Sequence, residues 1–240
     1  MMYRALLPNM FTVGNLFCGF LAMHYVMEGK YIPAAWLIVL GAALDKLDGR
    51  IARLVGNDSD FGIEFDSLVD VCTFGLVPAF MVYHSLLRSQ WGLTIAFIFL
   101  LCGALRLARY NISARKDDEE KTGFFTGLPI PLAAVALSQY VVFTERSWET
   151  THAATLGFLF VLALSFLMVS KVEYDPMPDF RSTAFWDRFK QTYFIVAIVL
   201  ISLPSTSNDY FFPLVGVYLL SGLYRWISKL ISNEVVEHTG

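Results

Sequence analysis

The chain has 240 residues, of which 56% are hydrophobic and only 16% are charged, and its formal net charge at pH 7 is −3. Soluble domains usually carry about 25% charged residues, so this composition excludes a water-soluble globule and, even more firmly, a disordered chain. Three widely separated cysteines exclude a secreted scaffold held by disulfides. The composition therefore predicts a polytopic membrane protein.

Apolar stretches of suitable length indicate an all-α bundle of about eight transmembrane helices, because roughly 20 helical residues cross the hydrocarbon core. The expected spans are residues 10–27, 31–54, 66–87, 91–110, 127–144, 151–170, 190–204 and 210–228. The second of these stretches turns polar after Leu44. We interpret residues 1–240 as one membrane-embedded domain without a separate soluble part.

The distribution of basic residues predicts the orientation of this bundle. With a cytoplasmic N-terminus and eight spans, all but three of the 18 Lys and Arg residues fall on the cytoplasmic side, the exceptions being Lys30, Arg88 and Arg146. Such a bias follows the positive-inside rule and predicts that both termini are cytoplasmic. We therefore expect a multi-pass protein of the cytoplasmic membrane, with the polar segments at 45–70 and 106–127 facing the cytoplasm.

Four aspartates form the most informative pattern. Asp45 and Asp48 are three residues apart, and Asp66 and Asp70 are four apart, so each pair shares one helical face. The turn-forming residues at 55–62 predict a helical hairpin that brings the pairs together. Divalent Mg²⁺ or Mn²⁺ would relieve the resulting repulsion, and four acids suffice for a two-metal site acting at phosphorus. Each aspartate taken alone is equally compatible with a solvated helix end.

Small and basic residues accompany these acids. Gly49 and Ala52 leave one helical face open to a bulky group, and Arg53 can bind phosphate oxygens in a bidentate manner. Gly62 allows a turn or close packing where the next helix begins.

Together these positions form the pattern D-x2-D-G-x2-A-R-x8-G-x3-D-x3-D over residues 45–70, and the chain resembles the CDP-alcohol phosphatidyltransferase family, whose signature this is. The resemblance implies a membrane enzyme, working as a homodimer among membrane lipids, that transfers a phosphatidyl group from a CDP-linked lipid to an alcohol and releases CMP. It implies two divalent metal ions held by Asp45, Asp48, Asp66 and Asp70. It also implies that Asp70 is the general base, and that Gly49, Ala52, Arg53 and Gly62 bind the CDP-lipid.

Three further stretches, residues 7–19, 102–110 and 124–131, resemble one branch of that family, the phosphatidylserine synthases. This likeness implies CDP-diacylglycerol and L-serine as substrates and no nucleic-acid partner. It places the catalytic core at about 7–131 and leaves about 151–230 as supporting spans.

The expected acceptor-binding residues are Arg106, Arg109, Ser67 and Gly127. Arg106 and Arg109 share a helical face and could hold the carboxylate of serine beside the acids. They equally fit a lipid phosphate or snorkelling anchors at the membrane surface. Gly127 either shapes the acceptor pocket or simply begins the fifth span.

Thr12 and Asn15, three residues apart, offer a hydroxyl and an amide to a cytosine edge, although small polar residues of this kind also pack membrane helices together. Transfer to glycerol 3-phosphate or inositol phosphate stays open as an alternative. From a different class, an ion-coupled transporter also uses intramembrane acids. The clustering of acids at one membrane face and the lack of an inverted repeat favour the enzyme.

Overall fold

The computed structural model describes residues 2–55, 60–115, 125–147, 150–170, 172–174 and 209–220, and the single positions 222, 224 and 226. The chain forms two compact units. The first comprises Met1–Asp117 with Pro129–Val169, and the second comprises Asp118–Leu128 with Ser170–Gly240.

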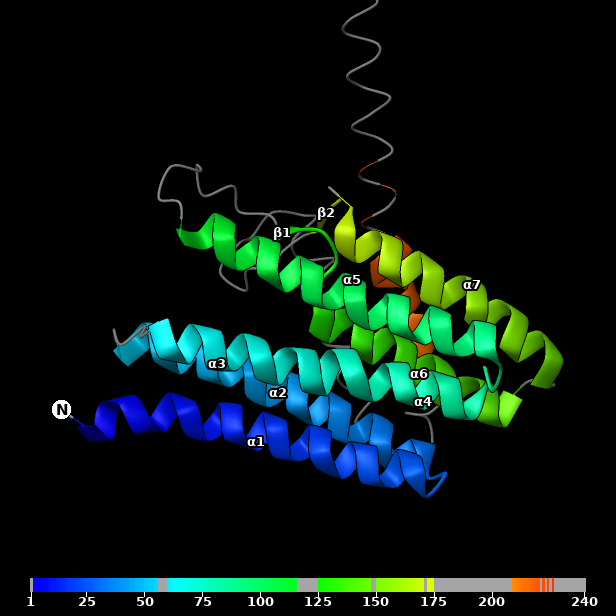
Figure 1. The fold of residues 1–240 in the computed structure, drawn as a ribbon, viewed down its shortest axis with the longest axis horizontal. Helices are drawn as coiled ribbons and strands as arrows, with labels where there is room; N and C mark the ends of the chain where they lie inside the picture. Colours follow the sequence, from blue (N-terminus) through cyan, green and yellow to red (C-terminus); the bar gives the residue numbers. More distant parts are fainter. Residues whose placement is uncertain are drawn as a thin grey trace, which may run out of the picture. The chain divides into compact units, whose positions relative to one another are not determined.

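The first unit is a bundle of helices (Figure 1). Its elements are α1 (Met2–Met27), α2 (Tyr31–Val55), α3 (Asp60–Asp70), the π-helix η1 (Val71–Leu76), α4 (Val77–Ser85), α5 (Gln90–Arg115), α6 (Ile130–Ser147) and α7 (Thr150–Val169). Helices α1 and α2 run antiparallel after a tight turn in which Gly29 has φ of 73°, a conformation that glycine adopts without steric cost. Helix α3, η1 and α4 follow one another without a break, so the predicted hairpin is formed by α2 and this composite helix.

The described part of the second unit contains a short pair of strands and one helix. Strand β1 (Phe125–Thr126) pairs antiparallel with β2 (Glu173–Tyr174), and helical residues begin again at Asp209. Gly127 has φ of 79° and donates its backbone N–H to the carbonyl of Val172 at 2.8 Å. The fifth predicted span at 127–144 therefore begins three residues late, at Ile130. The predicted span at 190–204 lies outside the described residues.

Four helical segments in the described chain are long and apolar enough to cross a membrane: Met10–Met27, Phe61–Ser85, Gln90–Ser113 and His152–Val169. Shorter apolar helices cover Ile130–Glu145 and Asp209–Leu220. Helix α2 has sufficient length, with 25 residues, but its second half carries the charged motif. The helical membrane architecture is confirmed at this level, whereas the count of eight spans and the cytoplasmic orientation stay predictions.

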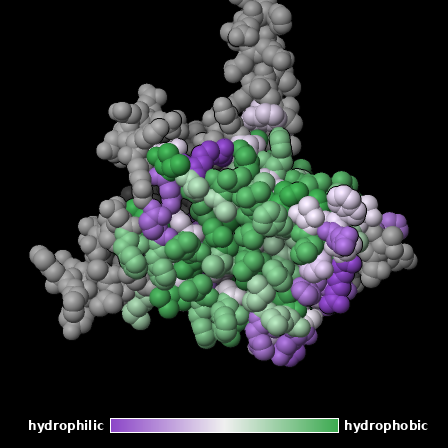
Figure 2. Space-filling model, viewed as in Figure 1, coloured by the Kyte–Doolittle hydropathy of each residue, from purple (hydrophilic) through white to green (hydrophobic). Residues whose placement is uncertain are grey.

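The outer surface of the first unit is apolar along much of its length. Large hydrophobic side chains such as Phe20, Phe97 and Phe166 are exposed, and Figure 2 shows hydrophobic residues over most of one face, with hydrophilic residues gathered mainly toward the helix ends. A lipid environment accounts for this surface, because a monomeric soluble protein rarely exposes apolar patches of this extent.

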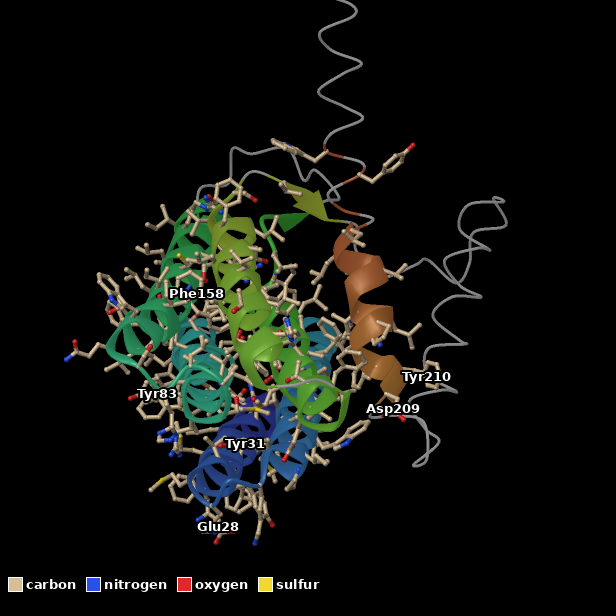
Figure 3. The ribbon with its side chains drawn as sticks, turned by 90° about the vertical axis from the view of Figure 1, so that its right-hand side faces the viewer. Glu28, Tyr31, Tyr83, Phe158, Asp209 and Tyr210 are labelled. Atoms are coloured by element: carbon tan, nitrogen blue, oxygen red, sulfur yellow. The ribbon has the colours of Figure 1, made fainter. Side chains whose placement is uncertain are left out.

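The end of the bundle at the α1–α2 turn is polar and aromatic. Glu28, Tyr31 and Tyr83 lie there, as Figure 3 shows in a view onto this end. Glu28 accepts from Lys30 at 2.8 Å and lies 3.3 Å from His24, and the hydrogen bond from Lys30 lowers the pKa of Glu28. Tyrosines beside such charges are typical of a membrane–water interface. The four aspartates lie toward the other end of the same helices.

Candidate active site

Three carboxylates meet where α2 faces α3. Asp45, Asp48 and Asp66 each contribute one oxygen, and these oxygens all lie within 4.8 Å of one another. The helical spacing explains the geometry, because positions 45 and 48 share one face of α2, and that face turns toward α3. The juxtaposition that the motif spacing predicts is therefore present in the fold.

Asp70 extends this cluster deeper into the bundle. It ends α3, is only 6% exposed, and its carboxyl group lies beside that of Asp45 and interacts with it electrostatically. Two neighbouring carboxylates repel each other unless a proton or a cation lies between them. Asp70 is thus connected to the other three acids through Asp45, and like Asp48 it is almost completely buried.

The donor set fits hard divalent cations. All the candidate ligand atoms are carboxylate oxygens, and Asp66 Oδ1 is buried without a hydrogen-bond partner in the described chain. Oxygen ligands on opposite sides of one Mg²⁺ lie roughly 4.2 Å apart, since each bond is about 2.1 Å long. A set of oxygens within 4.8 Å therefore suits one ion, or two ions that share ligands.

Helix α1 supplies polar side chains to two of these acids. Thr12 Oγ1 donates to Asp48 Oδ2 at 2.9 Å, and Asn15 Nδ2 donates to Asp70 Oδ1 at 3.5 Å. The sequence predicts these residues as nucleotide ligands, which stays a prediction, and in the structure both donate to carboxylates. Asn15 Oδ1 is buried and has no hydrogen-bond partner among the described residues.

Arg106 is a buried cation near the acids. It lies on α5 and is 8% exposed. Its guanidinium interacts electrostatically with the carboxylates of Asp70 and Asp45. Its guanidinium carbon lies 5.7 Å from the ring centroid of Tyr110, a favourable cation–π geometry. Its Nε is buried and without a hydrogen-bond partner in the part of the chain described. A buried guanidinium with an unused donor is suited to bind an incoming anion.

Arg109 has a different position from Arg106. Its guanidinium donates to the carbonyl oxygens of Val169 at 2.8 Å and Met168 at 3.4 Å. Because these are the last carbonyls of α7, Arg109 caps that helix and complements its dipole. Although the spacing predicts a shared helical face for Arg106 and Arg109, Arg106 lies near the acids, whereas Arg109 binds the end of α7.

Ser67 lies one turn before Asp70 and is half-buried. Its hydroxyl donates to the carbonyl of Ile63 at 3.0 Å and accepts from Asn111 Nδ2 at 2.8 Å. Asn111, on α5, is a residue that the sequence reasoning missed. The only signal for it was its position immediately after the 102–110 stretch.

The remaining predicted residues divide into four cases. Gly49 is exposed, and a Cβ placed there would meet nothing within 4 Å, so space for a bulky group exists beside the acids. Gly62 lies within α3 rather than in the preceding turn. Ala52 and Arg53 belong to α2, but their side chains lie outside the described residues. Gly127 belongs to the second unit, where its N–H binds Val172.

The arrangement has a definite chemical capacity. A group of carboxylate oxygens can bind divalent ions and, through them, a diphosphate, while an enclosed aspartate beside them can accept a proton. The neighbouring buried guanidinium is able to bind an anionic group. These features together suit transfer of a phosphorus-containing group between two substrates.

Comparison with known proteins agrees with this chemistry. The model of the CDP-alcohol phosphatidyltransferase family matches residues 5–169, and the chain belongs to that family. Among its relatives, the CDP-diacylglycerol–serine O-phosphatidyltransferase of Helicobacter pylori (strain J99) is 35% identical over 241 residues, covering 95% of each chain. The Bacillus subtilis protein of the same name is 34% identical over 74% of this chain and 93% of its own length. An archaetidylserine synthase from Methanothermobacter thermautotrophicus is 33% identical over 70% and 69%, respectively.

Proposed function

We propose that this protein transfers the phosphatidyl group of CDP-diacylglycerol to the hydroxyl of L-serine, giving phosphatidylserine and CMP. The observation that carries the proposal is the group of three carboxylates within 4.8 Å, enclosed Asp70 beside it, and the buried guanidinium of Arg106 nearby. The names of the relatives support serine as the acceptor. An acceptor that carries a carboxylate needs a cation at an otherwise acidic site, and Arg106 provides one.

In this proposal Asp45, Asp48, Asp66 and Asp70 hold two divalent ions, Mg²⁺ or Mn²⁺. Bound there, the ions would neutralise the charge of the diphosphate and of the departing phosphate. Asp70 has the second role of general base, because it lies outside the three-oxygen group and is almost completely buried. Thr12 and Asn15 keep Asp48 and Asp70 directed into the site through the two hydrogen bonds from α1.

The reaction then follows from the positions of these groups. Arg106 binds the carboxylate of serine and thereby directs its hydroxyl toward Asp70. Asp70 takes the hydroxyl proton as the oxygen forms a bond to the lipid-proximal phosphorus. The bond between that phosphorus and the bridging oxygen breaks, and CMP leaves with the electron pair. Holding both reactants in this orientation supplies much of the rate enhancement.

The CDP-lipid would lie along the wall formed by α1 and the second half of α2. The open surface at Gly49 accommodates the nucleotide, and Thr12, Asn15, Ala52, Arg53 and Gly62 line its path in this proposal. Acyl chains would stay in the surrounding lipid, because the outer surface of these helices is apolar. We further propose one catalytic domain with both termini and the active site facing the cytoplasm, working as a homodimer.

The direct test is headgroup transfer by the purified protein in detergent. With CDP-diacylglycerol and Mg²⁺ or Mn²⁺, serine should trigger CMP release and yield phosphatidylserine. Asp70→Asn should abolish turnover while CDP-diacylglycerol still raises the melting temperature of the protein. CMP release with glycerol 3-phosphate or inositol phosphate instead of serine would refute the acceptor assignment. No CMP release with any acceptor, from folded protein, would favour an ion-coupled transporter.

A further inference from the structure

A threonine immediately beyond the acid motif joins the helix that carries Asp70 to the helix that supports it. Thr73 is completely buried, and its Oγ1 donates to the backbone carbonyl of Asn15 at 3.3 Å. The side chain of the same Asn15 donates to Asp70. Asn15 is therefore held by η1 at its backbone and binds Asp70 with its amide.

This contact links two helices, as does the bond from Thr12 to Asp48, whereas several other helical hydroxyls bond locally. Thr94, Ser138, Thr144 and Ser165 each donate to a carbonyl of their own helix, as hydroxyl side chains within helices commonly do. Thr73 instead donates to another helix. It lies in the π-helical segment that begins directly after Asp70, and single π-turns inside longer helices often accompany functional sites.

Two glycines make this junction sterically possible. A Cβ at Gly19 of α1 would lie 2.5 Å from Thr73 Oγ1, which is closer than real contacts allow, and 3.1 Å from Thr73 Cα, which is a tight contact. A Cβ at Gly41 of α2 would lie 2.9 Å from Asn15 Oδ1 and 3.2 Å from Thr73 Cγ2. The three helices thus approach one another at Thr73 and Asn15, and small residues permit such close packing in membranes.

The same contacts determine the orientation of the Asn15 amide. The space left by Gly41 accommodates Oδ1, so that Nδ2 points to Asp70. The opposite orientation would place an amide oxygen against a carboxylate oxygen, which is a contact between two acceptors. Because Asn15 is 0% exposed, water cannot take over either role.

We propose that Thr73 is a positioning residue, which holds Asn15 so that its amide directs the carboxylate of Asp70 toward the acceptor hydroxyl. This inference rests on the proposed function, because it assigns Asp70 to proton transfer. The proposal gives a role to Thr73, which lies outside the acid motif, and to Gly19 and Gly41, which allow the contact. Thr73 does not itself touch a substrate.

The test is a set of kinetic measurements on the full-length protein in detergent. Thr73→Val keeps the shape and removes the hydroxyl, so it should lower kcat roughly three- to tenfold, the effect of one lost hydrogen bond. The KM values for serine and CDP-diacylglycerol should change less than twofold. Thr73→Ser restores the donor and should recover most of the wild-type kcat. Thr144→Val, which removes a buried hydroxyl that bonds only to its own helix, should leave kcat unchanged.

A double-mutant cycle separates positioning from general destabilisation. If Thr73 acts through Asn15, adding Thr73→Val to Asn15→Ala should produce little further loss of kcat. Equal losses in the two backgrounds, or no rescue by Thr73→Ser, would overturn the proposal. Serine-dependent CMP release by the wild-type protein, measured in the same assay, tests the proposed function separately.

Gly41→Ala provides a second perturbation of the same junction. The added methyl group would displace Asn15 Oδ1, so kcat should fall at least as far as in Thr73→Val. Gly157→Ala is the matched control, because its Cβ would approach Tyr140 Cε1 at 3.1 Å in the α6–α7 packing. Equal kcat values for Gly41→Ala and the wild type, in folded protein, would contradict the role of the junction.

Discussion

Replacement of Arg106 by Gln should separate acceptor binding from the rest of the reaction. Arg106 is 8% exposed, so its bond to a substrate carboxylate would form largely away from water. Removing one partner of a buried, hydrogen-bonded charge pair costs about 2–5 kcal/mol. Since each 1.36 kcal/mol is a factor of ten, kcat/KM for serine should fall roughly 30-fold to several thousandfold. The KM for CDP-diacylglycerol should stay near its wild-type value, because in the proposed mechanism the acids and the ions that they would hold bind the diphosphate.

The assay is initial-rate CMP release with varied serine and saturating CDP-diacylglycerol, accompanied by melting curves for each variant. Ethanolamine, which lacks the carboxylate, is the comparison acceptor. The preference of the wild type for serine over ethanolamine should shrink in Arg106→Gln. Arg109→Gln is the matched control, because it removes a guanidinium that caps α7 and should lower the melting temperature more than the affinity for serine. An unchanged serine KM in Arg106→Gln, or an equal loss with both acceptors, would refute the carboxylate assignment.

Two other substitutions test the metal ligands and the nucleotide wall. Asp66→Asn should reduce activity more than about 100-fold and weaken the stabilisation of the protein by Mn²⁺, because an oxygen of the three-carboxylate group loses its charge. The control Asp209→Asn, in the second unit, should change neither property. Equal Mn²⁺ stabilisation of the wild type and both variants would contradict the metal site. Gly49→Leu should fill the open surface beside the acids and raise the KM for CDP-diacylglycerol by about tenfold or more, since one or two kcal/mol of binding suffices for this. Gly216→Leu, at another position with open space, is the control, and matching KM values for the two glycine variants would be inconsistent with a nucleotide wall at Gly49.

The sequence alone was sufficient for the acid cluster. Helical spacing places Asp45 with Asp48, and Asp66 with Asp70, on single faces, and a hairpin must turn those faces toward each other. This inference succeeded because it depends on the periodicity of the helix and on a short connection, both of which are local properties. The apolar composition established the membrane environment in the same way, since it reflects the solvent around the whole chain.

Only the tertiary structure shows which groups Arg106 and Arg109 contact. Their spacing puts them on one side of α5, but the neighbours on that side differ along the helix. Arg106 lies level with the acids, whereas Arg109 lies level with the end of α7. Helical periodicity gives the direction of a side chain about its own axis and contains no information on which helix lies there.

The supports of Asp70 were also beyond the sequence. Asn15 and Thr73 are 58 residues apart, and each alone is an ordinary small polar residue in an apolar helix. Their roles arise because α1, α2 and η1 approach closely at Gly19 and Gly41, and because the helix becomes π-helical directly after Asp70. The sequence by itself thus determined the membrane class, the helical hairpin and its four acids, since these depend on composition and local spacing. Only the packing of helices distant in sequence decided which arginine faces the acids and which residues orient the proposed base.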